Sequence, residues 1–311
     1  MTVEEVTAAG LAAATAVAAG QGLPAGQARI LSARGNLMVH LAPSPVVARV
    51  ATFTAFSRRD PFAWLEREVA VAGFGARQGG PLVAPAAGGV DPGPHRHAGF
   101  AISLWTYLPS GPREPAGPDS AGRALGLLHR SLAGYPRPLP WLLPATEQIS
   151  DGLAALEREK ALEVSELSAL RTRQAGLMAV LDGASEQAIV LHGDAHAGNL
   201  LPVVASGAGT DAADATEDRW AWIDLEETCR GPREWDLAVL AGGWPAADDA
   251  AAALAAYAAV TGTAIPTAAM LAPFARVREL EAAVWALCMA CQYPARYRRV
   301  AQDLLARVRS G

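Results

Sequence analysis

The chain has 311 residues, 51% of them hydrophobic and 18% charged, and it carries a formal net charge of -5. This composition excludes an intrinsically disordered chain, because disorder requires low hydrophobicity and high net charge. At about 100–200 residues per domain, the length allows one large domain or two smaller ones.

The first hundred residues predict a helix followed by a small antiparallel sheet. Residues 3–19 are rich in alanine and begin with glutamates, which favours a helix. Short apolar runs joined by tight turns then predict antiparallel strands. These runs lie at 30–32, 37–41 and 46–50. Beyond them we expect a helix from Pro61 to about Arg77, a long loop at 79–99 and a strand at 100–108.

The rest of the chain is mainly helical. A linker rich in Gly and Pro is predicted at 110–118. The expected helices lie at 119–132, 151–182, 233–260 and, in pieces, 265–308, and short strands are expected at 188–191, 199–204 and 220–225. Between the last two strands, the low-complexity segment 205–218 predicts a loop insertion. We therefore expect a β-rich lobe at 1–109 and a larger helical lobe at 110–311.

Features typical of membrane or secreted proteins are weak. We expect no membrane-spanning helix, for which about 18 consecutive apolar residues are needed. The first ten residues contain two glutamates and no basic cluster, so they make a poor secretory signal. Cys229, Cys288 and Cys291 are too few and too late in the chain to form a disulfide framework. These observations predict a cytoplasmic protein.

Lysine occurs only once, as Lys160, so arginine accounts for all other basic residues. A Walker A loop needs a Gly-Lys-Ser/Thr segment whose lysine reaches the nucleotide phosphates, and the sequence contains none. A P-loop nucleotide site is therefore excluded. Lys160 lies in a charged helical segment, where the burial that would activate a Schiff-base lysine is not expected.

The clearest chemical motif is the segment 192–199, His-Gly-Asp-Ala-His-Ala-Gly-Asn, which short strands bracket. A second acidic pair, Asp224 and Glu226, follows the next predicted strand. Phosphoryl transfer from a nucleotide needs a carboxylate for the acceptor hydroxyl and oxygen ligands for magnesium. Asp194, Asn199 and Asp224 supply this set of groups.

These motifs resemble the aminoglycoside phosphotransferase branch of the protein-kinase-like superfamily. The resemblance rests on His-Gly-Asp-x-His-x-x-Asn at 192–199, Ile-Asp-x-Glu at 223–226 and Arg-Gly-Pro-Arg-Glu-Trp-Asp at 230–236. It extends over about residues 28–300 and is most specific at 189–238. It implies an α+β, bilobal protein-kinase-like fold with a small β-rich N-terminal lobe and a larger helical C-terminal lobe, and ATP and magnesium as cofactors.

The resemblance also implies roles for the motif residues. Asp194 would be the catalytic base, and Asn199 and Asp224 would hold magnesium. Asp236 would brace the catalytic loop through backbone hydrogen bonds, with His192 packed beneath that loop.

Two residues of the motif allow more than one interpretation. Glu226 shares a face with Asp224 on an extended chain, so it either reaches a metal or is a surface acid. His196 either orients the carboxylate of Asp194, contacts a phosphate, or is a structural histidine with a hydrogen-bonded ring.

The N-terminal lobe is expected to cover the nucleotide. Kinases use a basic residue on the third strand, which touches the phosphates and pairs with a glutamate on the next helix. Arg49 stands at the strand position, and of the two glutamates on the helix we favour Glu68 over Glu66. Gly35 is the single glycine of the turn that precedes the second strand, which is far from a glycine-rich loop.

Trp105 and Tyr107 fall where the two lobes join. A hinge at this place presents backbone carbonyl and amide groups to the purine, so we expect both residues in the cofactor site. The alternative interpretation is a buried edge strand.

We therefore expect an ATP- and magnesium-dependent phosphotransferase that acts on a hydroxyl of a small molecule. Residues 205–260 contain 11 acids and 3 arginines, which gives -8 and favours a cationic acceptor. An aminoglycoside or other cationic antibiotic is one candidate acceptor, which would make the protein a resistance enzyme. A metabolic kinase of an endogenous alcohol, amine or sugar and a catalytically silent nucleotide-binding protein are the alternatives. No nucleic-acid or membrane partner is expected, and the oligomeric state is unknown.

Overall fold

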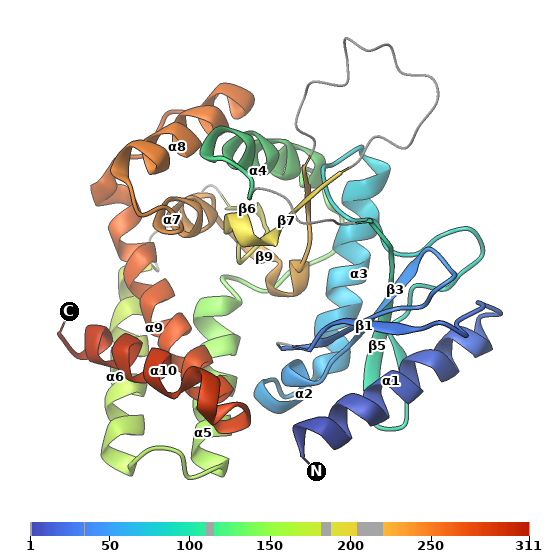
Figure 1. Ribbon diagram of the computed structural model, residues 1–311. Helices are drawn as coiled ribbons and strands as arrows, with labels where there is room; N and C mark the ends of the chain where they lie inside the picture. The colour runs from blue at the N-terminus through green and yellow to red at the C-terminus, as the bar shows by residue number, and fades with distance from the viewer. Residues whose placement is uncertain (1, 34, 110–114, 182–187, 204–219, 311) are drawn as a thin grey trace.

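Five strands of the N-terminal lobe form an antiparallel sheet in the order β1-β2-β3-β5-β4 (Figure 1). Their bounds are β1 Arg29–Ser32, β2 Leu37–His40, β3 Val46–Val50, β4 His95–His97 and β5 Phe100–Thr106. The structure is a computed structural model that describes residues 2–33, 35–109, 115–181, 188–203 and 220–310. Strand β3 is buried along its whole length, so Arg49 is enclosed by protein.

Strand β4 corrects the loop expected at 79–99. His95 pairs with Ile102 and His97 pairs with Phe100, which makes β4 an edge strand of the sheet. The pairing depends on contacts with β5, whereas the local composition of Gly and Pro favours turns. The composition of the segment therefore gave no indication of β4, which forms by pairing with the neighbouring strand β5.

Helix α1, Val3–Gly20, lies along the sheet (Figure 1). It begins with a capping box, in which Thr2 and Glu5 satisfy each other's backbone amides. Its small buried residues, such as Ala14 and Ala18, pack in one cluster with the side chains of β2 and β3. By length and mean hydropathy α1 is also the one described helix that could cross a membrane, and its span includes Glu4 and Glu5.

Helix α2, Phe53–Ser57, is followed by α3, Pro61–Arg77, which begins as the sequence predicts. The Asp60 carboxylate accepts hydrogen bonds from the Phe62 and Ala63 amides, both at 3.2 Å, and Pro61 occupies the first helical turn. Spacing of four residues puts Trp64 and Glu68 on the same buried face. This face of α3 therefore carries an acid into the interior.

Helices dominate the C-terminal lobe. They are α4 Pro118–Leu132, α5 Ile149–Arg158, α6 Val164–Leu181, α7 Glu234–Gly242, α8 Ala247–Thr261, α9 Ala268–Gln292 and α10 Pro294–Ser310, with a π-helical turn η1 at Pro144–Gln148. The single helix expected at 151–182 is two helices, because Lys160 adopts a positive φ of 52° that interrupts the α-helical hydrogen bonding. The segment 205–218 and residues 110–114 of the expected linker lie outside the described residues, and the division at 109/110 stays a prediction.

Two short antiparallel strand pairs carry the polar motifs. Strand β6, Ala188–Leu191, pairs with β9, Cys229–Pro232, and β7, Leu200–Pro202, pairs with β8, Trp220–Trp222. The sequence did not predict β9. The short 3-10 helices η3, Ala197–Asn199, and η4, Leu225–Glu227, follow β6 and β8. This nesting brings the loop after β6 next to the loop after β8.

Candidate active site

The loop after β6 carries the His-Gly-Asp motif and depends on a glycine. Gly193 has a φ of 94°, and a Cβ there would lie 2.2 Å from the Glu227 backbone oxygen. The His192 ring is buried, lies 3.0 Å from the Ile223 carbonyl through Nε2, and accepts the Asp194 amide at Nδ1 (3.2 Å). Burial lowers the pKa of His192, which fits a neutral ring with its proton on Nε2. His192 thereby links the two adjacent loops.

Asp236, in the first turn of α7, is fully buried and binds the backbone of this loop. Its Oδ2 accepts the His192 amide at 2.7 Å and its Oδ1 accepts the Gly193 amide at 3.0 Å. The ring of His129, on α4, lies 2.9 Å from the same Oδ2 through Nε2. The indole of Trp235 donates to the Gly193 carbonyl at 2.7 Å. Asp236 and Trp235, which are neighbours on α7, thus hold the loop backbone through hydrogen bonds.

Asp194 is surrounded by groups that favour its ionised form. Asn199 Nδ2 donates to the Asp194 carbonyl at 2.9 Å and lies 3.3 Å from Oδ2. His196 Nε2 lies 3.4 Å from Oδ2, and the guanidinium of Arg278 contacts Oδ1. Burial alone would raise the pKa of Asp194, but Arg278 and His196 outweigh burial and hold this pKa well below its usual range. Asp194 is therefore a carboxylate at neutral pH.

Arg49 meets three acids from different parts of the chain. Its Nη1 lies 2.9 Å from Glu68 and 2.7 Å from Asp224, and its Nη2 lies 2.7 Å from Glu226. Glu66, the other glutamate of α3, is exposed, so the structure pairs Arg49 with the favoured Glu68. Burial raises the pKa of Glu68 to about 8, although the charge of Arg49 acts in the opposite sense. The strand residue, the helix glutamate and the acidic pair thus form one cluster.

Glu226 is not a surface acid, since its side chain is only 12% exposed. Besides Arg49 it accepts a hydrogen bond from Thr54 Oγ1 at 2.9 Å, and Asn36 Nδ2 lies 3.4 Å away. The sequence left two alternatives for this residue, a metal contact or a surface acid, and the second is wrong. In the structure Glu226 connects the hairpin between β1 and β2 to α2 and to η4.

Asp224 is the most accessible acid of the cluster, with a side chain that is 41% exposed. Its backbone adopts a left-handed conformation, with φ at 64°, directly before η4. The amide of the preceding Ile223 donates to the Asn199 carbonyl at 3.0 Å. Asp194, Asn199 and Asp224 therefore lie on loops that are hydrogen-bonded to each other.

Trp105 and Tyr107 lie at the junction of the lobes, but their amides are engaged elsewhere. Tyr107 donates its amide to the Pro45 carbonyl at 2.9 Å, and Trp105 is paired with Val47 in the sheet. The Trp105 indole is buried and donates to Ser103 Oγ at 2.8 Å. The Tyr107 ring stacks on His40 with ring centroids 3.7 Å apart. Trp105 is thus buried on an interior strand, whereas the alternative interpretation expected an edge strand, and the place of both residues in the cofactor site stays a prediction.

Four charged residues that were assigned no role from the sequence complete the cluster. Arg278 and Glu281 lie on α9, Glu227 lies on η4, and Arg58 directly follows α2. Arg278 Nη1 lies 2.6 Å from Glu281, and Arg58 Nη2 lies 3.7 Å from Glu227. The spacing of three residues between Arg278 and Glu281 is a helical ion-pair signal that was available in the sequence.

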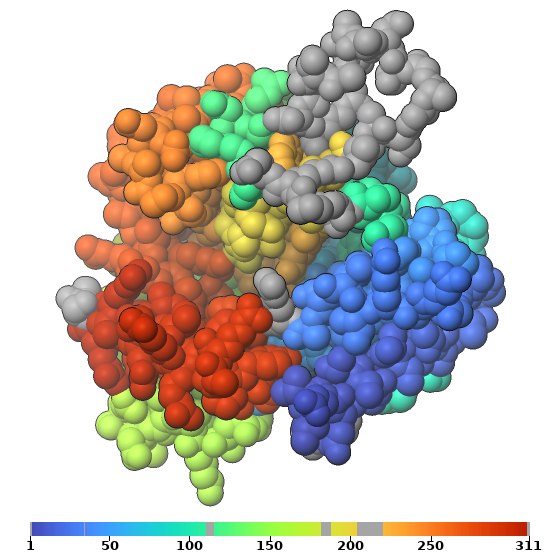
Figure 2. Space-filling model, in the orientation of Figure 1, coloured from blue at the N-terminus to red at the C-terminus, as the bar shows by residue number. Residues whose placement is uncertain are grey.

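The site joins side chains of both lobes, since Arg49 and Glu68 lie on β3 and α3 and contact Asp224 and Glu226 of the C-terminal lobe or each other. Figure 2 shows the blue N-terminal lobe on one side and the orange and red helices on the other, with a yellow surface between them that belongs to the segment near residue 200. In the described part of the chain, no three acidic, histidine or cysteine side chains converge into a ready metal cage. The oxygen groups near Asp224 would need further ligands from phosphate and water, which is how magnesium binds in nucleotide sites.

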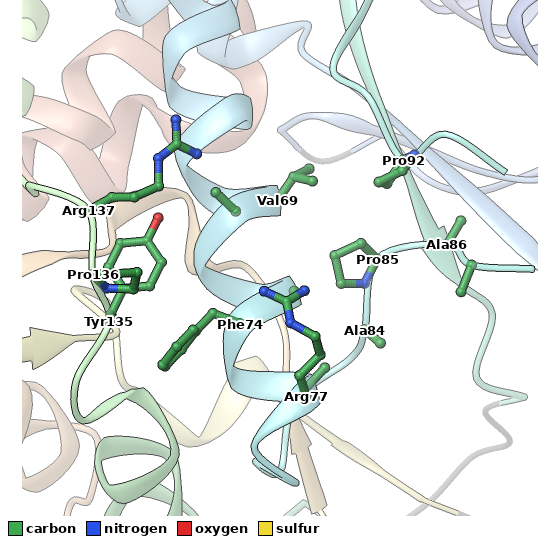
Figure 3. Close-up of a pocket in the computed structure, with 14 residues that line it drawn as sticks. Val69, Phe74, Arg77, Ala84, Pro85, Ala86, Pro92, Tyr135, Pro136 and Arg137 are labelled. Atoms are coloured by element: carbon green, nitrogen blue, oxygen red, sulfur yellow. The ribbon is translucent and has the colours of Figure 1, made fainter. Parts of the chain in front are cut away.

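Two cavities lie away from these residues. One, of about 510 Å³, lies between α3, residues 84–87 and Tyr135, with Arg77 and Arg137 on its lining (Figure 3). Another, of about 660 Å³, lies between α4, residues 79–82 and Trp220. Neither is lined by Asp194, Asn199 or Asp224.

A family model described as the phosphotransferase enzyme family matches residues 39–274. The match includes β3, α3 and both polar loops. The chain belongs to this family. The resemblance to aminoglycoside phosphotransferases is thereby confirmed at the level of the family. No curated protein matches the chain.

Solved structures of family relatives share the bilobal kinase-like fold, which confirms the expected fold. A choline/ethanolamine kinase family protein from Mesorhizobium loti is 19% identical, with a TM-score of 0.61 over 99% of this chain and 94% of that chain. An aminoglycoside phosphotransferase from Streptomyces rimosus, solved with ADP and streptomycin, is 17% identical, with a TM-score of 0.56 over 87% and 98%. An amicoumacin kinase, in complex with AMP-PNP, Ca²⁺ and Ami, is 12% identical, with a TM-score of 0.63 over 90% and 88%.

Proposed function

We propose that the protein is an ATP- and magnesium-dependent kinase that phosphorylates a hydroxyl of a small molecule. The observation that carries the proposal is the position of the Asp194 carboxylate, which contacts Arg278 and lies beside Asn199 on a loop hydrogen-bonded to the loop of Asp224. This arrangement supplies one carboxylate for the acceptor and separate oxygen groups for a cation. Membership of the phosphotransferase family supports the same reaction.

Asp194 acts as the base in this proposal. Its carboxylate orients the acceptor hydroxyl and takes its proton late in the transfer, because the transition state of phosphoryl transfer is loose. Positioning and charge neutralisation then contribute more than base strength. The low pKa of Asp194 suits this role, since the carboxylate stays ionised and serves mainly to align the hydroxyl.

Asn199 and Asp224 would hold magnesium through oxygen atoms. The Asn199 amide nitrogen faces Asp194, so its oxygen is the group that faces away. The exposed carboxylate of Asp224 is a hard oxygen donor of the type that magnesium prefers. A bound magnesium ion would supply charge neutralisation for the triphosphate. The residues present therefore fit the ion.

Arg49 is the cation of the N-terminal lobe that lies closest to this set. Because it is shared among Glu68, Asp224 and Glu226, it keeps its charge and a fixed position beside Asp224. Its planar fork can contact phosphate oxygens and Glu68 together. The Tyr107 amide already donates to Pro45, so a hinge contact of Tyr107 with the purine would use its carbonyl oxygen.

The experiment is release of ADP from magnesium-ATP across a panel of aminoglycosides, choline-like amines, sugars and amino-acid alcohols. We expect at least one acceptor to stimulate release, and we expect Asp194→Ala to abolish stimulation while AMP-PNP with magnesium still binds. Asp248→Ala, an exposed acid on α8, is the matched control and should keep full turnover. Full turnover in Asp194→Ala would refute the assignment of the base.

A further inference from the structure

Arg278 lies where three acidic side chains meet. It projects from α9 and contacts Asp194 Oδ1 through Nη2. Its Nη1 lies 2.6 Å from Glu281 Oε2, one helical turn away, and 3.5 Å from Glu227 Oε2. The side chain is 23% exposed, so protein encloses the guanidinium on most sides.

The surroundings of Arg278 explain why a cation is required there. Asp194, Glu227 and Glu281 come from the catalytic loop, η4 and α9, and all three are largely enclosed. Like charges this close repel each other strongly when water is excluded. Arg58 is the second cation of the group, but among the described contacts its ion pairs run to Glu226 and Glu227, not to Asp194. Arg278 is therefore the cation that faces the catalytic carboxylate.

The two oxygens of Asp194 have different neighbours. Oδ1 is held by the charged guanidinium of Arg278. Within the described ranges of the chain, Oδ2 has two long contacts, with Asn199 Nδ2 at 3.3 Å and His196 Nε2 at 3.4 Å. Contacts of that length are weaker than hydrogen bonds near 2.9 Å. Oδ2 is thus the oxygen that an incoming hydroxyl can engage more readily.

We propose that Arg278 is a positioning residue for the phosphoryl transfer. By binding Oδ1 it fixes the rotation of the Asp194 carboxylate and presents Oδ2 to the acceptor. The acceptor O–H bond then breaks and its proton goes to Oδ2, while the acceptor oxygen bonds to the γ-phosphorus. The bond between that phosphorus and the bridging oxygen breaks, and ADP leaves with the electron pair. The inference rests on the proposed function, in which Asp194 is the base.

The test compares Arg278→Ala, Arg278→Lys and Arg276→Ala in the full-length protein. Arg276 is an exposed arginine on the same helix and serves as the matched control. The assay uses magnesium-ATP with the best acceptor of the panel, or with water as acceptor if hydrolysis is the only turnover. Binding of AMP-PNP with magnesium is measured in parallel for every variant.

We expect Arg278→Ala to lower kcat about 100-fold, the loss typical of a misplaced catalytic group. The KM for ATP should change less than about twofold, because the interaction acts on the transition state. Arg278→Lys should recover part of the rate, since it keeps the charge without the fork. Free guanidinium ion should raise the kcat of Arg278→Ala several-fold and leave Asp194→Ala unchanged. A role only in stability predicts the reverse, because guanidinium denatures proteins.

The outcomes separate the two proposals. Wild-type kcat in Arg278→Ala, or a reduced kcat that guanidinium lowers further, overturns the role of Arg278 while the kinase assignment stands. Absence of both nucleotide binding and turnover in the wild type overturns the kinase assignment, and the role of Arg278 falls with it.

Discussion

Replacing Asp236 by Asn should destabilise the protein through the catalytic loop. The carboxylate accepts three buried hydrogen bonds, from the amides of His192 and Gly193 and from the ring of His129. An asparagine has one acceptor oxygen and one amino group. If its oxygen takes the place of Oδ2, the amino group faces the Gly193 amide, and two donors oppose each other without an acceptor. The flipped amide is worse, because it opposes the other two donors.

The magnitude follows from these bonds. A buried donor without a partner costs about 1–3 kcal/mol, and the retained bonds lose the contribution of the charge. We therefore expect Asp236→Asn to lower the free energy of unfolding by about 2–4 kcal/mol. The rate should also fall, because the His192 and Gly193 amides position the residue that follows them, Asp194.

The assay is equilibrium unfolding in urea. The slope of the unfolding free energy against urea concentration is compared between variants, because an unchanged slope shows that only stability changed. The control is Asp248→Asn on the exposed face of α8, where a change within about 0.5 kcal/mol is expected for a surface residue. A stability loss in Asp236→Asn no larger than that of the control would refute the argument that this carboxylate braces the loop.

Two further predictions concern a glycine and a glutamate. Gly193→Ala should abolish turnover, because its Cβ would lie 2.2 Å from the Glu227 backbone oxygen. The control Gly176→Ala lies in open space on α6, so it should keep turnover and stabilise the helix by about 0.5–1 kcal/mol. ADP release measures turnover and urea unfolding measures stability for both variants. Because burial raises the pKa of Glu68 to about 8 in the folded state, above its unfolded value, stability should fall as pH rises from about 4.5 to 8. Unfolding at several pH values should show this slope in the wild type and its loss in Glu68→Gln, and an equal slope in both would contradict the buried, protonated carboxyl.

Much of the N-terminal lobe was predictable because its signals are local. The cap at Asp60 and the four-residue spacing of Trp64 and Glu68 depend on neighbours along the chain, so the start and buried face of α3 could be derived from sequence. The resemblance placed Arg49 and Glu68 together, and the structure puts them 2.9 Å apart. The sequence could not separate the single expected helix at 151–182 into α5 and α6, since a positive φ at Lys160 leaves no mark in composition.

Two strands lie in segments whose composition disfavours strands, and neither was predicted. Strand β4 consists of three residues in a segment of turn-forming composition and pairs with β5 across the two-residue turn at Ala98 and Gly99. Strand β9 contains Gly231 and Pro232, which are poor strand formers, and it forms because β6, far earlier in the chain, supplies its hydrogen bonds. For Trp105, the place at the lobe junction was predictable, whereas the hydrogen bond from its indole to Ser103, two residues earlier on the same strand, was not predicted.

By itself the amino-acid sequence determined the chemistry of the loop at 192–199 and the family to which it points, because those residues are close in the chain and their spacing is set by one turn. Only the tertiary structure decided that Arg278 reaches Asp194, since 84 positions separate them and nothing in local spacing relates the two. The physical reason is that a buried carboxylate needs a cation from whichever element packs over it, and that element is chosen by the packing of α9 against the rest of the lobe.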